Sequence, residues 1–268
     1  MSAISASLVK ELRDRTGAGM MDCKRALEES GGDVEAARTL LRERGMAQVG
    51  KRAGRETTEG KVGVRISGGV GTLVAIGCET EPVSNNDEFL AWGKRVLEAV
   101  ERGGPEAAAE LEAERIELAA RLGENIVVRG GTRMQAGDGE TLAQYVHPPA
   151  NKIGVLVRVR GGSEAAARQL AMHVSFGDPE WLRREDVPAD AVEAERQIYL
   201  NSDELQGKPE QAREKIVEGM LNKRFFARQP GGVLLDQPYI HDSGQTVGKA
   251  LDAAGMELLE FARYDVGA

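Results

Sequence analysis

The sequence predicts an α+β protein: a helical module, a core of two related α+β subdomains with small antiparallel sheets, and a protruding antiparallel helical hairpin. Three observations support this prediction. Apolar residues near the start have helical spacing, a strand-like alternation followed by helical spacing occurs twice, and a long charged helical stretch follows residue 188. The predicted boundaries are a helical module at 1–50, a first subdomain at 51–140, a second beginning at 141–188, the hairpin at 189–226, and a return to the second subdomain at 227–268.

Composition limits the class of protein. Of 268 residues, 41% are hydrophobic, which suffices for a packed core. The 35 basic and 43 acidic residues give a net charge of −8 without a basic stripe, so nucleic acid is not expected as the primary partner. The N-terminus lacks a signal-peptide pattern. The longest apolar run, residues 70–78, is shorter than the roughly 20 residues of a membrane span. We expect a cytoplasmic protein with its two cysteines reduced.

The first module reads as three helices. Apolar residues recur every four positions over 4–12, and the glycines within 16–19 end that first helix. A second helix is expected over 20–29, and Asp33 is a typical N-cap for a third. The charged segment 51–61 is interpreted as a linker.

The core shows one pattern twice. Alternation over 62–66 and a nearly continuous apolar run over 72–78 predict a hairpin, followed by a helix that Asn86 caps. A second, continuous helix is expected to run to about Leu122. A fainter copy follows: strands at 141–146 and 153–159, then a helix over 165–174. We infer an internal duplication, with each sheet covered on one face by helix.

The last eighty residues begin with two charged helical segments, 189–205 and 209–224. They predict an antiparallel hairpin with little core and arms roughly 24 Å long. A helix near 247–254 and a strand near 258–264 could return the chain to one of the sheets.

Signals of enzymatic chemistry are weak. In the segment 244–250, which comes nearest to a P-loop, the glycines are one residue too close and Ala250 replaces the magnesium-binding hydroxyl. The three histidines are far apart in sequence, and no serine nucleophile elbow occurs. We therefore predict no catalytic residues, no metal and no cofactor.

Two N-terminal runs, LVKELR (8–13) and TGAGMMDCKRAL (16–27), closely resemble the opening of elongation factor Ts. The resemblance continues in order along nearly the whole chain, through residues 77–100, 121–126, 153–157, 172–174, 208–209, 216–219, 246–248 and 264–267. The chain is identified as a member of this family.

The resemblance implies a fold and an activity. The family has an N-terminal module similar to ubiquitin-associated domains, two related α+β subdomains and a coiled-coil protrusion. Some members add a C-terminal helical module, which we expect this chain to lack. The implied partner is GDP-bound elongation factor Tu, from which the family releases nucleotide without acting as an enzyme.

The resemblance also implies site residues. The family's Thr-Asp-Phe-Val loop, whose Phe wedges between partner helices near the magnesium site, corresponds here to Thr80, Glu81, Pro82 and Val83. Glu is longer than Asp, and Pro is smaller and stiffer than Phe, so the match is partial. The other expected partner contacts are Lys24, Ile153, Gly154, His173, Ile240 and His241.

Two rival functions stay open. A helical-bundle adaptor could bind peptides or ubiquitin-like partners through the first module, although the hairpin–helix units would then have no purpose. An enzyme that uses a nucleotide or a metal is disfavoured by the missing motifs.

Overall fold

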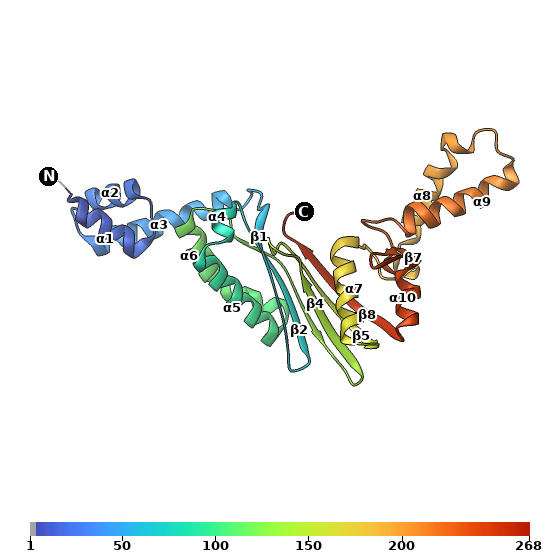
Figure 1. The fold of residues 1–268 in the computed structure, drawn as a ribbon. Helices are drawn as coiled ribbons and strands as arrows, with labels where there is room; N and C mark the ends of the chain where they lie inside the picture. Colours follow the sequence, from blue (N-terminus) through green and yellow to red (C-terminus); the bar gives the residue numbers. More distant parts are fainter. Residues whose placement is uncertain (1–3) are drawn as a thin grey trace.

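A computed structural model describes residues 4–268, so the first three residues of the predicted helical module lie outside it. The module contains α1 (Ala6–Thr16), α2 (Met20–Glu29) and α3 (Val34–Arg52). The Asp33 carboxylate accepts hydrogen bonds from two backbone amides of α3, as an N-cap does. Because α3 extends to Arg52, the predicted linker is confined to the few residues before β1. Figure 1 shows α3 leading from the module to α6.

The first sheet has the order β1-β2-β3, with β1 at Glu59–Ser67, β2 at Val70–Cys78 and β3 at Val127–Gln135, all antiparallel. The predicted hairpin is confirmed, and β3 was not predicted. The single turn α4 (Glu81–Ser84) follows β2.

Helices α5 (Asp87–Gly103) and α6 (Glu112–Leu122) cover this sheet. Asn86 caps α5 through hydrogen bonds to two backbone amides. The prediction of one continuous helix up to Leu122 is wrong. A 3-10 segment, Pro105–Leu111, precedes α6, and its buried Ala107 shows that this tighter turn folds the chain back against the body.

The second sheet repeats the plan. It has the order β4-β5-β8, with β4 at Glu140–Val146, β5 at Ile153–Gly161 and β8 at Met256–Asp265. Helices α7 (Glu164–Gly177) and α10 (Val247–Ala253) pack on it. The short strands β6 (Pro238–Tyr239) and β7 (Asp242–Thr246) pair separately. The predicted return of the C-terminal strand to a sheet is confirmed.

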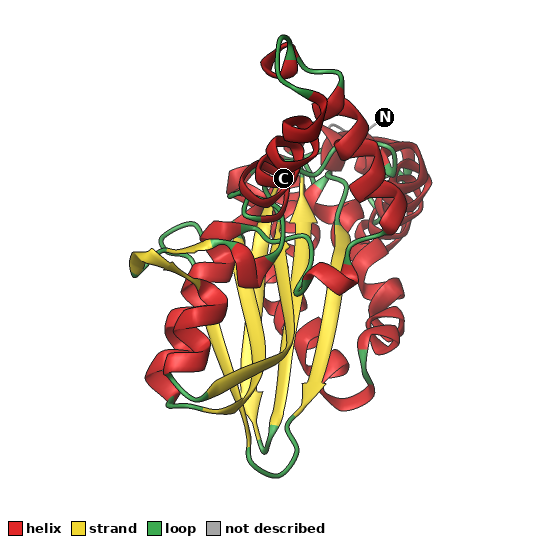
Figure 2. Ribbon diagram, turned by 90° about the vertical axis from the view of Figure 1, so that its right-hand side faces the viewer, coloured by secondary structure: helices red, strands yellow, loops and turns green. Residues whose placement is uncertain are grey.

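The two sheets face each other between outer layers of helix (Figures 1 and 2). Leu73 and Leu156 share one buried cluster between the sheets, whereas Val74 and Val155 lie under the helices on the opposite faces. The prediction that helices cover one face of each sheet is therefore confirmed, and the other sheet covers the opposite face. A strand buried on both faces has no polar side to alternate with, which explains the continuous apolar run in β2.

The remaining helices leave the second sheet's layer and return to it. They are α8 (Ala189–Leu200) and α9 (Glu210–Met220), the latter continued by a π-helical segment. Helix α8 is about 18 Å long at 1.5 Å per residue, shorter than predicted, because the chain turns after Leu200 and ends this segment in a 3-10 turn at Asp203–Leu205. Helix α9 and its π-helical continuation to Phe226 together cover the predicted second segment. The two ends of this excursion meet at a bridge between Trp181 and Val233. Over residues 4–268, no helix combines the length and apolar character needed to cross a membrane.

Candidate partner-binding surface

The loop after β2 forms a rigid, outward-facing turn. Thr80 has an extended backbone, and α4 begins at Glu81 with Pro82 in its first turn, where a missing amide costs nothing. The side chains of Thr80, Glu81 and Pro82 are exposed, whereas Val83 packs against the core under α5. The loop therefore presents a carboxylate and a stiff apolar ring, anchored by a valine.

A second surface lies on α2. Lys24 is exposed, with its Nζ 3.8 Å from a carboxylate oxygen of Glu28. One helical turn earlier, Met20 and Met21 are 47% and 62% exposed. Apolar side chains this exposed, beside a cation, are typical of interaction surfaces. The helical spacing of apolar residues in the sequence does not mark these methionines as a surface. Two adjacent residues at the start of a helix cannot both face the core, so at least one exposed methionine could have been expected.

A third surface is an apolar groove of about 580 Å³ beside the second sheet. It brings Ile153, predicted from the sequence, together with Ile240, which is 38% exposed. Phe176, at the end of α7, also lines the groove and is 70% exposed. The complete lining comprises Tyr145, His147, Ile153, Met172, Ser175, Phe176, Gln229, Pro238, Tyr239, Ile240 and Ser243. His241 is exposed next to Ile240, and its Nε2 lies 3.2 Å from the carbonyl oxygen of Gln169.

The groove and the α4 loop lie at the same end of the paired sheets. Strand β2 ends at Cys78, opposite Glu59 at the start of β1. The Val62 amide in β1 donates to the Asn151 carbonyl, just before β5, at 2.8 Å. Figure 1 shows α4 and one end of α7 near the upper ends of the two sheets. One partner surface could therefore span both features.

His173 does not lie on the surface. Its side chain is fully buried, so direct contact with a partner is not possible in this conformation. Its Nδ1 accepts from the Ile240 amide at 3.3 Å, which leaves Nε2 to donate to Oε1 of Gln237 at 2.9 Å. Burial lowers the pKa of His173 to about 4, so the ring is neutral at pH 7. In this structure it supports the backbone that presents Ile240 and His241.

Gly154 is also buried, and it packs between the sheets. A Cβ there would lie 2.9 Å from Leu73 Cδ1 and from Val62 Cγ2. The resemblance implies a partner contact at Gly154, whereas the geometry here corresponds to core packing between the sheets.

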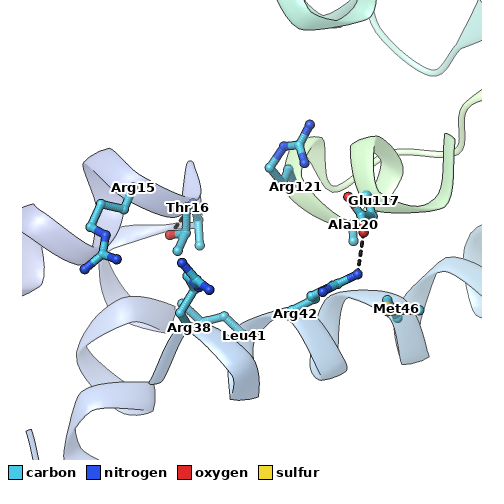
Figure 3. Close-up of a pocket in the computed structure, with 10 residues that line it drawn as sticks. Arg15, Thr16, Arg38, Leu41, Arg42, Met46, Glu117, Ala120 and Arg121 are labelled. Carbon is cyan, nitrogen blue, oxygen red and sulfur yellow. Dashed lines mark hydrogen bonds and ion pairs between the residues drawn. The ribbon is translucent and has the colours of Figure 1, made fainter. Parts of the chain in front are cut away.

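A further hollow, of about 240 Å³, lies between the N-terminal module and α6 (Figure 3). Arginines from three helices line it, but they already pair with carboxylates: Arg42 with Glu117 at 2.5 Å, and Arg121 with a glutamate on α5 at 2.7 Å. Such exposed pairs are ordinary surface interactions. Within residues 4–268, no three His, Cys, Asp or Glu side chains are arranged to hold a metal ion.

Comparison with known proteins shows what kind of chain carries these surfaces. The family model described as "Elongation factor TS" matches residues 79–268. The chain belongs to the elongation factor Ts family. It is 43% identical to Elongation factor Ts of Alkalilimnicola ehrlichii, over 99% of this chain and 92% of that protein. Elongation factor Ts of Idiomarina loihiensis is 42% identical, over 99% and 91% of the two chains. Elongation factor Ts of Actinobacillus succinogenes is 43% identical, over 100% and 92%.

The elongation factor Ts match includes the α4 loop, the groove and the α8–α9 excursion, all of which lie within residues 79–268. The helical module before residue 79 is covered by the full-length relatives. All three candidate surfaces thus lie in parts of the chain that its relatives share.

Proposed function

We propose that the chain is a translation elongation factor that acts in the cytoplasm as a guanine-nucleotide exchange factor for elongation factor Tu. It binds the GDP-bound partner, disturbs the site of Mg²⁺ and phosphate, and releases GDP so that GTP can bind. The process needs no covalent chemistry and no cofactor of the exchange factor's own.

The observation that supports this proposal best is the presentation of Glu81 and Pro82. A group that wedges into a partner must project from the body and must resist deflection. Both residues are exposed, Pro82 has a fixed φ, and Val83 anchors the turn in the core. The turn is therefore pre-organised, and little conformational entropy is lost when it inserts.

The mechanism is a linkage between two binding equilibria. If the chain binds the empty partner more tightly than the loaded one, it weakens nucleotide binding by the same factor. A wedge near the partner's magnesium displaces the groups that hold the ion, and the diphosphate charge is then poorly neutralised.

The other surfaces provide the grip. In this proposal, Lys24 and the exposed methionines of an N-terminal module similar to ubiquitin-associated domains contact the partner's GTPase domain. The groove with Ile153 and Ile240 contacts its third domain, with His241 at the edge. The excursion at 189–226 forms the family's antiparallel coiled coil, and the subdomain boundaries follow those predicted from the sequence.

Nucleotide release tests the proposal directly. Elongation factor Tu from the same organism is loaded with fluorescent GDP, the chain is added in catalytic amounts with excess unlabelled GTP, and fluorescence is followed. We expect release to be many times faster than spontaneous dissociation. Release at the spontaneous rate would refute the proposal.

Replacement of Pro82 by alanine tests the role of the loop. The P82A variant should slow release at saturating concentration several-fold while its melting temperature stays close to that of the wild type. The matched control is P105A, since Pro105 is also exposed in the first turn of a short helical segment, but after α5. Equal effects of both substitutions on release would rule out a special role for Pro82.

An adaptor function has one observation in its favour, the exposed Met20 and Met21 on α2. Deletion of residues 1–50 separates the two functions. An exchange factor should keep weakened activity through the α4 loop and the groove, whereas an adaptor should lose all binding.

A further inference from the structure

The segment that leads into the α4 loop is held by one carboxylate from a distant part of the chain. Oε2 of Glu124, two residues after α6, accepts from the amides of Glu79 and Thr80 at 3.0 and 3.1 Å. Its Oε1 accepts from Oγ1 of Thr80 at 2.5 Å. Hydrogen bonds to a charged acceptor are stronger than neutral ones, so this group fixes Glu79 and the first residue of the loop, Thr80.

The Glu79 side chain in turn binds the segment that contains Glu124. Its Oε1 accepts from the Asn125 amide at 2.6 Å, and its other oxygen pairs with Arg55 at 3.3 Å. The buried Asn125 side chain donates to the carbonyl oxygen of Arg55 at 2.8 Å. Segments 79–80 and 124–125 are thus joined through side chains, in place of strand pairing.

The loop needs such a support because its own helix is too short. Helix α4 has four residues, and a single turn is unfavourable in isolation. Thr80 stands at its N-cap but makes no side-chain capping bond, and its hydroxyl donates to Glu124. Glu124 therefore helps to set the direction in which α4 leaves β2, together with the buried anchor Val83.

We propose that Glu124 is a positioning residue for nucleotide release: it holds Thr80 extended and thereby aims Glu81 and Pro82 at the partner. This inference rests on the exchange function proposed above. The carboxylates of Glu79 and Glu124 bind different parts of the chain. Glu79 and Asn125 connect to the chain after α3. In the part of the chain that the structure describes, every hydrogen bond of the Glu124 side chain goes to residues 79 and 80.

The test measures the GDP-release rate against the concentration of the exchange factor for wild type, E124A and E124Q. We expect E124A to lower the rate at saturation about tenfold, the equivalent of about 1.4 kcal/mol. Its half-saturating concentration should stay within about twofold of wild type, because the other two surfaces still bind. E124Q keeps an acceptor oxygen of the same reach and should recover most of the rate.

The matched control is E114A. Glu114 lies on α6 and, among residues 4–268, pairs only with Arg95 on the solvent side, at 2.7 Å, so its loss should leave release unchanged. Thermal unfolding of all variants supplies the readout for a structural role. Differences between E124A and wild type in melting temperature should not exceed those of E114A by more than a few degrees.

The outcomes separate the inference from the function on which it rests. If wild type does not accelerate release, the exchange function fails. If wild type accelerates release and E124A equals it, the positioning role is refuted. If E124A loses affinity in proportion to thermal stability and E124Q gives no recovery, Glu124 merely holds the body together and the inference is equally refuted.

Discussion

Replacement of Gly154 by alanine decides whether this residue contacts the partner or packs the two sheets together. The new Cβ would lie 2.9 Å from Leu73 Cδ1 and 3.0 Å from Val62 Cβ. Leu73 is fully buried and Val62 nearly so, and valine is stiff at χ1, so neither can move aside freely. Such overpacking costs about 1–3 kcal/mol, or a fall in melting temperature of about 2–4 °C per kcal/mol in a chain of this size.

Gly63 provides the control. It lies in β1, and a Cβ there would be 3.6 Å from Leu97 Cδ2, an ordinary contact. Because alanine restricts the unfolded chain, G63A should be neutral or more stable by about 0.4–1 kcal/mol. Urea unfolding, followed by circular dichroism and tryptophan fluorescence, gives the free energy of unfolding of each variant. If G154A unfolds like wild type but binds elongation factor Tu more weakly, the packing argument is refuted and Gly154 is a contact residue.

Three other variants test the site and its supports. His173 has its pKa lowered to about 4, so the unfolded chain binds more protons below pH 6.5, and stability should fall by about 2 kcal/mol from pH 7.5 to 5; H173Q should lose most of this pH dependence in urea unfolding. Phe176 is 70% exposed, so F176A should leave the melting temperature nearly unchanged but weaken partner binding about five- to tenfold in calorimetry, whereas I198A, at an equally exposed position on α8, should not. Asn86 caps α5, and N86A should cost about 1 kcal/mol in thermal unfolding; no loss would mean that water replaces the cap.

Local patterns predicted most of the elements. The alternation in β1 and the N-caps Asp33 and Asn86 each act within a few residues, and the structure confirms them. Strand β3 escaped prediction because Gly130 and Gly131 interrupt its apolar pattern. The first of these glycines is explained by a residue far away in the sequence, since a Cβ on Gly130 would lie 2.6 Å from the Tyr264 ring.

The site was predicted less completely, because it too depends on residues that are far apart in the sequence. A resemblance identified the loop at Thr80, but the carboxylate that supports it comes from Glu124, and no local pattern marks a pairing across 44 residues. Periodicity assigned the helix that contains His173 without showing that this side chain turns inward while Phe176 turns outward. Both facts depend on how α7 sits over the second sheet.

The excursion that contains α8 and α9 starts and ends at one place on the second sheet's layer. The Leu234 amide donates to the Trp181 carbonyl at 2.8 Å, and the Glu180 amide to the Gly232 carbonyl at 2.9 Å. Its buried side chains form a cluster of their own. Because both ends of the excursion are joined at its base, it is a structural unit attached to the body at one place. A lineage can lengthen, shorten or exchange it while β8 keeps its place beside β5, so the reach of the molecule can change independently of its body.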